Sequence, residues 1–275
     1  MNDITHLSLF TGIGGIDIAA EWAGFRTIGQ VEQNKYALRI LRNRFGRRIS
    51  RWSDIRDISA SDFKRRTGID SPTLISGGFP CQPFSLTGTR RGTADDRYLW
   101  PEMFRIVREL RPSWVIGENV TGIVSMELEH CCSDLEGEGY TVRSFLIPAC
   151  GVGALHRRER VFIVAHAEGA GLANRWIPGG TPPTFARPER GRAAVPDADH
   201  AGGPLLRPPH SSRRPAQPVP WDGGGWWAAE PRVGRVAHGV PHRVDRLRGL
   251  GNAVVPQQIY PILAGIAQIE QETMT

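Results

Sequence analysis

Short apolar segments alternate with helix-like segments along the first 165 residues, and this alternation constrains the fold more than any other feature. The strand candidates lie at residues 6–10, 27–31, 73–76, 114–116, 144–147 and 160–165. Helical periodicity occurs at residues 16–22, 37–45 and 102–110. Strands that alternate with helices predict an α/β fold, in which a parallel sheet carries helices on both faces.

The chain changes character after this alternating region. Twelve of its 21 prolines lie between residues 166 and 240, together with many glycines and no sustained period. Such a composition predicts a loop-rich insert, part of it without a fixed structure. Apolar periodicity returns in "PQQIYPILAGIAQIEQE", which predicts a closing helix that packs on the first domain. We therefore expect a main domain at 1–165, a small insert at 166–240, and a segment at 241–275 that completes the main domain.

Composition excludes several classes of protein. No apolar run approaches the roughly 20 residues of a membrane helix, and the N-terminus lacks an export signal, so we expect a cytoplasmic protein with no membrane partner. The four cysteines form no C-x-x-C pair, which argues against a disulfide framework and against a metal site. The net charge is +6, and Lys35 and Lys64 are the only lysines. The arginines favour a polyanionic partner, although a GC-rich genome explains the bias equally well.

A glycine turn follows the first strand. Gly12, Gly14 and Gly15 let the backbone approach a ligand closely, and Glu32 follows 17 residues after Gly15, near the spacing at which an acid binds a ribose. The turn is not G-x-G-x-x-G and no lysine follows it, which weakens dinucleotide and P-loop interpretations. S-adenosylmethionine, with a ribose and no phosphate, fits better, and Asp54 could accept a bond from its adenine. A packing turn and a helix-capping Asp54 remain alternatives.

The segment "SGGFPCQPFS" at residues 76–85 holds Cys81 between two prolines, which fix the direction of its sulfur. A thiol becomes a nucleophile when a nearby positive charge lowers its pKa. Arg158 and Arg160, expected on one side of a strand, could supply that charge. Glu118 follows another strand at the edge where open α/β sheets hold their sites. An inert thiol, a surface acid and solvated arginines are the alternatives.

Five blocks in sequence order resemble the DNA cytosine-5 methyltransferase family: "LFTGIGG", "GGFPCQPFS", "GENV", "HRRERVFIVA" and "GNAVVP". They spread over almost the whole chain except the proline-rich insert. The resemblance implies a Rossmann-like, S-adenosylmethionine-dependent methyltransferase sheet and methylation of cytosine carbon 5 in double-stranded DNA. It also implies a bacterial or phage-borne modification enzyme, which we expect to be a monomer, with a cognate restriction endonuclease left open.

The resemblance implies a role for each candidate catalytic residue. Cys81 adds to carbon 6 of the cytosine, and Glu118 bonds or protonates the ring at N3. Arg160 holds the cytosine carbonyl oxygen, and Arg158 supports Glu118 or a phosphate. The base must leave its stack to reach these groups.

The same resemblance implies two sets of binding residues. The cofactor set is Phe10, Gly12, Gly14, Gly15, Glu32, Asp54, Ile55, Pro80 and Asn252. The DNA set, in or beside a loop that closes over the flipped base, is Gln82, Ser85, Arg90, Arg91 and Arg97.

The chain departs from the family pattern at His156, where a glutamine is usual, and at Ser8, where an aspartate is frequent. The insert is short for a target-recognition domain, and its tryptophans and arginines could serve packing, base contact or phosphate binding. Those residues are Trp221, Trp226, Trp227, Arg207, Arg213 and Arg214. Three other functions stay open: an RNA cytosine-5 methyltransferase, a non-catalytic DNA-binding relative and a nicotinamide oxidoreductase.

Overall fold

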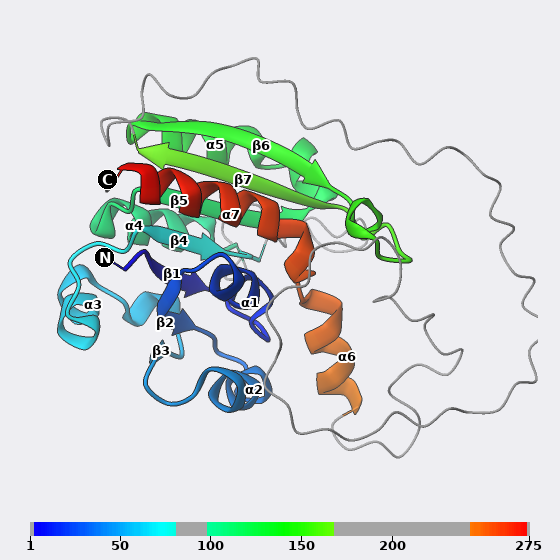
Figure 1. Cartoon of the computed structure of the whole chain (residues 1–275), viewed down its shortest axis with the longest axis horizontal. Coiled ribbons are helices and arrows are strands. Elements are labelled where there is room, and N and C mark those ends of the chain that lie inside the picture. Colours follow the sequence, from blue (N-terminus) through cyan, green and yellow to red (C-terminus); the bar gives the residue numbers. More distant parts are fainter. Residues whose placement is uncertain (1–2, 81–97, 168–242, 274–275) are drawn as a thin grey trace, which may run out of the picture.

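A seven-stranded sheet forms the centre of the protein (Figure 1). The computed structural model describes residues 3–80, 98–167 and 243–273. The strands are β1 (Thr5–Leu9), β2 (Arg26–Val31), β3 (Ser50–Trp52), β4 (Leu74–Gly77), β5 (Trp114–Val120), β6 (Tyr140–Ile147) and β7 (Arg160–Ala167). Their order across the sheet is β3-β2-β1-β4-β5-β7-β6.

The sheet is mixed, so the expectation of a parallel sheet is wrong at one edge. The strands from β3 to β5 pair in parallel, whereas β7 lies antiparallel to both β5 and β6. The connection from β6 to β7 spans residues 148–159 and contains only a short 3-10 turn, η4 (Ala149–Val152). A parallel neighbour needs a crossover, usually a helix, and this connection has none. Strand β7 therefore returns between β5 and β6.

Helices flank the sheet. They are α1 (Gly15–Trp22), α2 (Lys35–Phe45), α3 (Ala60–Thr67), α4 (Trp100–Leu110), α5 (Leu128–Gly137), α6 (Arg243–Asn252) and α7 (Pro256–Thr273). Four of them, α1, α2, α4 and α7, overlap the helical segments that the sequence predicted. Two further 3-10 turns are η1 (Ile55–Asp57) and η3 (Thr121–Ser125). None of the helices in the described part of the chain is long and apolar enough to cross a membrane.

Each face of the sheet carries its own apolar core. Helices α1 and α7 pack against each other on one face, where Ile16 and Ala20 share a buried cluster with Ile259 and Leu263. Helices α4 and α5 contribute buried side chains to the cluster on the other face. Strand β5 serves both, because successive side chains of a strand point to opposite faces. The expected arrangement of helices on both faces is confirmed, and Figure 1 shows α7 lying along the sheet.

Several polar side chains of β1, α1 and β2 are buried and contact one another. Asp17, on α1, accepts hydrogen bonds from the Ser8 hydroxyl (2.8 Å) and from Nε2 of Gln30 (2.7 Å). His6 contacts Thr27 at 3.0 Å. Burial lowers the pKa of His6 to about 3 and raises that of Asp17 to about 6, although the two hydrogen bonds oppose the rise at Asp17. The aspartate is therefore a buried acid whose ionisation opposes folding.

We expect Asp17→Asn to raise the free energy of unfolding by about 2–3 kcal/mol above pH 6, because a folded-state pKa of about 6 exceeds the ordinary 3.8. The folded chain binds this proton more tightly, so Asp17 reduces stability as the pH rises from about 4 to about 6. Asparagine keeps an acceptor for Gln30 and offers a donor to the Ser8 oxygen. Urea unfolding of both chains at about pH 4 and about pH 8 measures the difference.

Both chains keep His6, whose effect on stability changes with pH in the opposite direction to that of Asp17. The difference between their free energies of unfolding therefore cancels the contribution of His6. Asp17→Leu is the matched control, because it leaves the Ser8 hydroxyl and the Gln30 amide without their acceptor and should destabilise the chain at both pH values. A difference between wild type and Asp17→Asn that does not change with pH would contradict the prediction.

Candidate active site

The parallel pairing of three neighbouring strands stops at the same edge of the sheet. Leu9 of β1 pairs with Gly77 of β4, and Gly77 pairs with Gly117 of β5. The residues that follow in register are Phe10, Gly78 and Glu118. This edge is where open α/β sheets bind their ligands.

Glu118 is buried at this edge and is paired with Arg160. Its Oε1 lies 2.7 Å from Nε of Arg160, and both side chains are about nine-tenths buried. Glu118 pairs with Phe162 on β7, so Arg160, two residues away on that strand, is its diagonal neighbour. Burial raises the pKa of Glu118 to about 7, although the charges of Arg160 and Arg158 lower it. The carboxyl group can therefore both donate and accept a proton near neutral pH.

Gly78 leaves room for this carboxyl group. A Cβ added at Gly78 would lie 2.8 Å from Oε2 of Glu118, so any side chain there would displace the carboxylate. Asn119 holds the next residue, because its Nδ2 donates to the carbonyl oxygen of Phe79 at 3.0 Å. The Phe79 ring packs against Trp100 with centroids 5.1 Å apart. These contacts fix the segment that leads to Pro80 and thence to Cys81.

The glycine turn after β1 is held by Glu32. Oε2 of Glu32 accepts a hydrogen bond from the Gly12 amide, and Oε1 accepts one from the Asn34 amide, both at 2.7 Å. Burial raises the pKa of Glu32, and these backbone bonds oppose the rise. Gly12 has φ +59°, and a Cβ added there would meet no described atom within 4 Å. Among the described residues, the turn thus faces open space beside a carboxylate, and a carboxylate there could accept hydrogen bonds from a ribose.

Two of the predicted cofactor residues pack against the protein itself. Gly14, with φ +88°, is the N-cap of α1, and a Cβ there would lie 2.7 Å from the Phe45 ring. A Cβ at Gly15 would lie 2.4 Å from the carbonyl oxygen of Val254. The packing alternative raised for the turn thus applies to these two glycines. Asn252 is exposed at the end of α6, two residues before Val254.

Asp54 and Ile55 lie at the end of β3. Oδ1 of Asp54 accepts a hydrogen bond from the Arg56 amide at 2.9 Å, so the capping alternative holds in this structure. Ile55 is buried, and Asp54 keeps 40% of its side chain exposed. Asp54 is near Glu32 in the fold, because β3 and β2 pair in parallel and the Glu32 amide donates to the carbonyl oxygen of Trp52.

Arg158 differs from its expected position. Strand β7 begins at Arg160, so the two arginines do not alternate along one strand as expected. Arg158 has φ +32°, and its Nη2 donates to the carbonyl oxygens of Leu250 (3.3 Å), Gly251 (2.5 Å) and Ala253 (2.7 Å). It therefore caps the C-terminal end of α6, where carbonyl groups lack partners within the helix. Its charge still lowers the pKa of Glu118.

Several predicted residues lie outside the described residues. They are Cys81, Gln82, Ser85, Arg90, Arg91, Arg97, Trp221, Trp226, Trp227, Arg207, Arg213 and Arg214. Within the described ranges, Phe10 is partly buried against the core, Pro80 is half-buried, His156 is exposed, and Ser8 is buried against Asp17. No group of three or more metal-ligating side chains occurs in those ranges.

Sequence reasoning gave no role to Asn119, which it quoted only within the block "GENV". Asn119 holds the carbonyl group of Phe79, two residues before Cys81, and a second polar residue directly after Glu118 in β5 was the available signal.

The fold and this edge of the sheet define the class of protein. Two solved structures share the fold with a TM-score of 0.51 each. One is a prophage-encoded E. coli protein described as a candidate DNA modification methyltransferase, with 27% identity, 60% of this chain and 47% of that chain covered. The other is a mutant of Spodoptera frugiperda DNMT2, with 22% identity and coverages of 60% and 50%. The chain is an α/β protein with the methyltransferase fold.

Sequence comparison identifies the family. The model for C-5 cytosine-specific DNA methylases matches residues 4–195, more than half of the chain, and the chain belongs to that family. Type II methyltransferase M.FnuDI of Fusobacterium nucleatum is 33% identical over 177 residues, which cover 62% of this chain and 49% of the relative. M.HhaI of Haemophilus parahaemolyticus is 27% identical over 183 residues, with coverages of 65% and 54%. This chain spans about half the length of these relatives, and the expected family is confirmed.

Proposed function

We propose that this protein transfers a methyl group from S-adenosylmethionine to carbon 5 of cytosine in double-stranded DNA. One observation carries the proposal. Glu118, a buried carboxyl group with a pKa near 7, lies against the backbone of Gly78 and is held by Arg160. Cys81 follows Gly78 by three residues, so their Cα atoms are at most about 11 Å apart. An acid and a thiol are thus available at one edge of the sheet.

The proposed reaction begins with addition of the Cys81 thiolate to carbon 6. The S–C6 bond forms, the C5–C6 π electrons shift toward N3, and N3 takes a proton from Glu118. The ring becomes an enamine whose carbon 5 is nucleophilic. S-adenosylmethionine, when bound, would supply the electrophilic methyl group, and S-adenosylhomocysteine would leave as the S–CH3 bond breaks. Glu118 recovers its proton as carbon 5 is alkylated, a base removes the hydrogen from carbon 5, and the thiolate leaves as the C5–C6 double bond reforms.

Arg160 has two tasks in this proposal. Its Nε bond holds Glu118 in place, and its guanidinium has further N–H groups that can hold the cytosine carbonyl oxygen. Arg158 caps α6 and adds positive charge near Glu118, which favours the carboxylate between the two proton transfers. Arginine suits both positions because it stays charged at every working pH.

The geometry of the turn and its neighbours supports the cofactor residues that the resemblance implies. We propose that Phe10 and the Gly12 amide border the cofactor, that Glu32 binds its ribose, and that Asp54 and Ile55 bind its adenine. Pro80 and Asn252 would border the methionine end, while Gly14 and Gly15 shape the turn. Each carboxylate oxygen of Glu32 already accepts one hydrogen bond from a backbone amide. Each oxygen has a second lone pair that can accept a hydrogen bond from a ribose hydroxyl group.

The DNA part of the proposal rests on the family and on sequence. The target cytosine would leave the duplex, which costs a few kcal/mol of unstacking. Gln82, Ser85, Arg90, Arg91 and Arg97 would then contact DNA around it. We propose residues 166–240 as the target-recognition insert between a catalytic domain at 1–165 and its completing segment at 241–275. The protein would act as a monomer in the cytoplasm of a bacterial or phage-infected cell.

Cys81→Ser is expected to abolish methyl transfer while leaving cofactor binding unchanged, because a hydroxyl group is a much weaker nucleophile than a thiolate. The assay uses labelled S-adenosylmethionine with duplex DNA and, separately, with transfer RNA. Duplex DNA containing 5-fluorocytosine should form a covalent complex with the wild-type chain, because fluorine cannot leave carbon 5 as a proton does.

Three results would contradict the proposal. Methylation by Cys81→Ser would remove the thiolate from the mechanism. Transfer to RNA alone would favour the RNA-directed alternative, and DNA binding without trapping would favour a non-catalytic relative. Cys150→Ser is the matched control, since Cys150 is an exposed thiol on the loop before β7, and it should retain full activity.

A further inference from the structure

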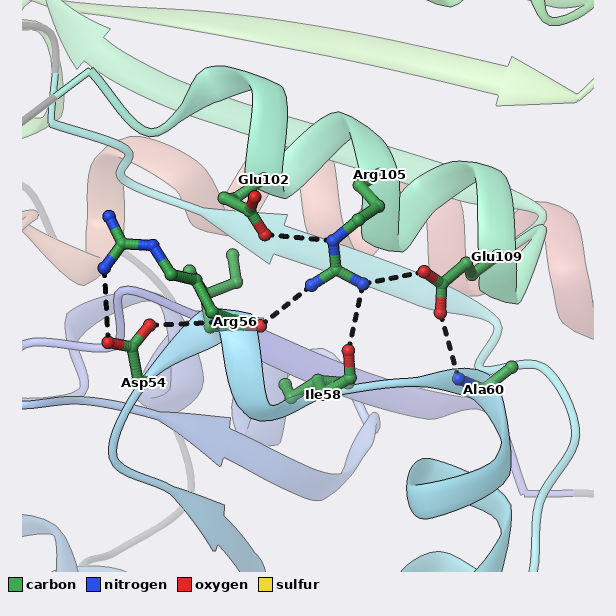
Figure 2. Close-up of polar contacts among 8 residues, drawn as sticks. Asp54, Arg56, Ile58, Ala60, Glu102, Arg105 and Glu109 are labelled. Atoms are coloured by element: carbon green, nitrogen blue, oxygen red, sulfur yellow. Dashed lines mark hydrogen bonds and ion pairs between the residues drawn. The ribbon is translucent and has the colours of Figure 1, made fainter. Parts of the chain in front are cut away.

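One helix holds the loop that follows β3. Figure 2 shows the guanidinium of Arg105, on α4, between two carboxylates of its own helix and two carbonyl groups of the loop. Nη2 of Arg105 donates to the carbonyl oxygen of Ile55 at 3.1 Å, and Nη1 donates to that of Ile58 at 3.0 Å. Ile55 and Ile58 precede Arg105 by about 50 residues, so these hydrogen bonds join the loop after β3 to helix α4.

The guanidinium is itself held on two sides. Its Nε lies 2.9 Å from Oε2 of Glu102, and its Nη1 lies 2.7 Å from Oε1 of Glu109. Glu102 and Glu109 are three residues before Arg105 and four residues after it, on the same face of the helix. Only 33% of the Arg105 side chain is exposed. These two ion pairs therefore fix the direction in which the Arg105 guanidinium points toward the loop.

Glu109 adds a second link to the same loop. Its other oxygen, Oε2, accepts a hydrogen bond from the Ala60 amide at 3.1 Å, at the start of α3 (Figure 2). Helix α4 thus contacts the loop at Ile55, Ile58 and Ala60. The loop contains only the three-residue 3-10 turn η1, and such a short turn has little stability of its own.

This loop carries Asp54. The carboxylate of Asp54 accepts the Arg56 amide and lies 3.4 Å from Nη1 of the Arg56 guanidinium, so its direction follows the backbone of η1. The side chain of Ile55 is buried in the core while its carbonyl group is bound by Arg105. Movement of the Ile55 carbonyl would therefore move the Asp54 carboxylate with it.

We propose that Arg105 is a positioning residue for recognition of the cofactor's adenine ring, acting through Asp54 and Ile55. The inference rests on the proposed function, because it takes Asp54 as the acceptor of the adenine amino group. Arg105 holds the loop in the shape that receives the ring. It has no role in the covalent chemistry, which we propose for Cys81 with Glu118 as the acid.

The test is the affinity of the whole chain for S-adenosylhomocysteine, measured by calorimetry. We expect Arg105→Met to weaken binding about tenfold, which corresponds to roughly 1.4 kcal/mol. We expect Arg105→Lys to restore part of this loss, because an ammonium can reach one of the two carbonyl groups. Arg108→Met is the matched control: Arg108, on the same helix, pairs with Glu138 and is 60% exposed, and its loss should leave affinity unchanged.

A second ligand separates positioning from general destabilisation. This ligand is the S-adenosylhomocysteine analogue whose adenine amino group is replaced by hydrogen. The wild-type chain should bind it more weakly than the natural ligand, whereas Arg105→Met should discriminate much less between the two. Equal discrimination by both chains would overturn the inference, as would unchanged affinity of Arg105→Met for S-adenosylhomocysteine. Failure of the wild-type chain to bind S-adenosylhomocysteine would instead count against the proposed function.

Discussion

Glu118→Gln is expected to lower the rate of methyl transfer by about 10²–10⁴-fold, the usual contribution of a positioned general acid. The glutamine has nearly the same shape and can still accept a hydrogen bond from Arg160, so the chain should fold and bind the cofactor. What it lacks is the proton for N3 of the cytosine. Single-turnover methylation of duplex DNA measures the loss.

The same variant should change the pH profile. Burial raises the pKa of Glu118 to about 7, so the wild-type carboxyl group is protonated below that pH and loses its proton above it. If the acid form protonates the ring, the rate falls as the pH rises through about 7, and the glutamine variant lacks this descending limb. The folded-state pKa also exceeds the ordinary 4.5, so Glu118 reduces stability as the pH rises from 4.5 to about 7.

Glu159→Gln is the control for this experiment, since Glu159 lies next to Arg160 in the sequence and its side chain pairs with Arg157 outside the site. It should keep the wild-type rate and the wild-type pH profile. A Glu118→Gln chain that methylates at more than a tenth of the wild-type rate would remove Glu118 from the proposed mechanism.

Gly15→Ala is expected to lower the free energy of unfolding by about 2–3 kcal/mol, near the upper end for an added methyl group in a packed site. The new Cβ would lie 2.4 Å from the carbonyl oxygen of Val254, and backbone cannot rotate away as a side chain can. Helix α1 would have to separate from the segment between α6 and α7. Urea unfolding followed by circular dichroism measures the change.

Gly12→Ala provides the contrast within the same turn. Its Cβ would meet no described atom within 4 Å, so the cost is the positive φ alone, about 1–2 kcal/mol. The methyl group would instead occupy space beside Glu32, so this variant should lose affinity for S-adenosylmethionine. If the two variants were equally stable, the packing role assigned to Gly15 would be wrong.

The strands could be predicted because their apolar runs are short and bounded by turns. The direction of β7 could not, because it depends on the missing crossover helix between residues 148 and 159. Helix α5 buries only Cys131 and Leu135, and α6 contains two glycines before its last residue, so neither gave a clear helical period.

Some residues of the candidate site could be placed from the sequence and others could not, and the reason is physical. Glu32 directly follows β2, and Glu118 lies within β5 just past its parallel pairing with β4, so the strand pattern alone brought both to the right edge of the sheet. Arg158 and Gly15 owe their contacts to the end of α6 and the residues between α6 and α7, more than 90 residues later, which no local pattern reveals. Arg105 likewise acts on a loop about 50 residues earlier.

The shared cluster of α1 and α7 also sets an order of events during synthesis. Ile16 and Ala20 leave the ribosome about 240 residues before Ile259 and Leu263, their partners on that face. Until then one side of the nascent sheet stays open to water and to chaperones. The turn beside Glu32 can gain its full support only after Val254 and α7 have been made.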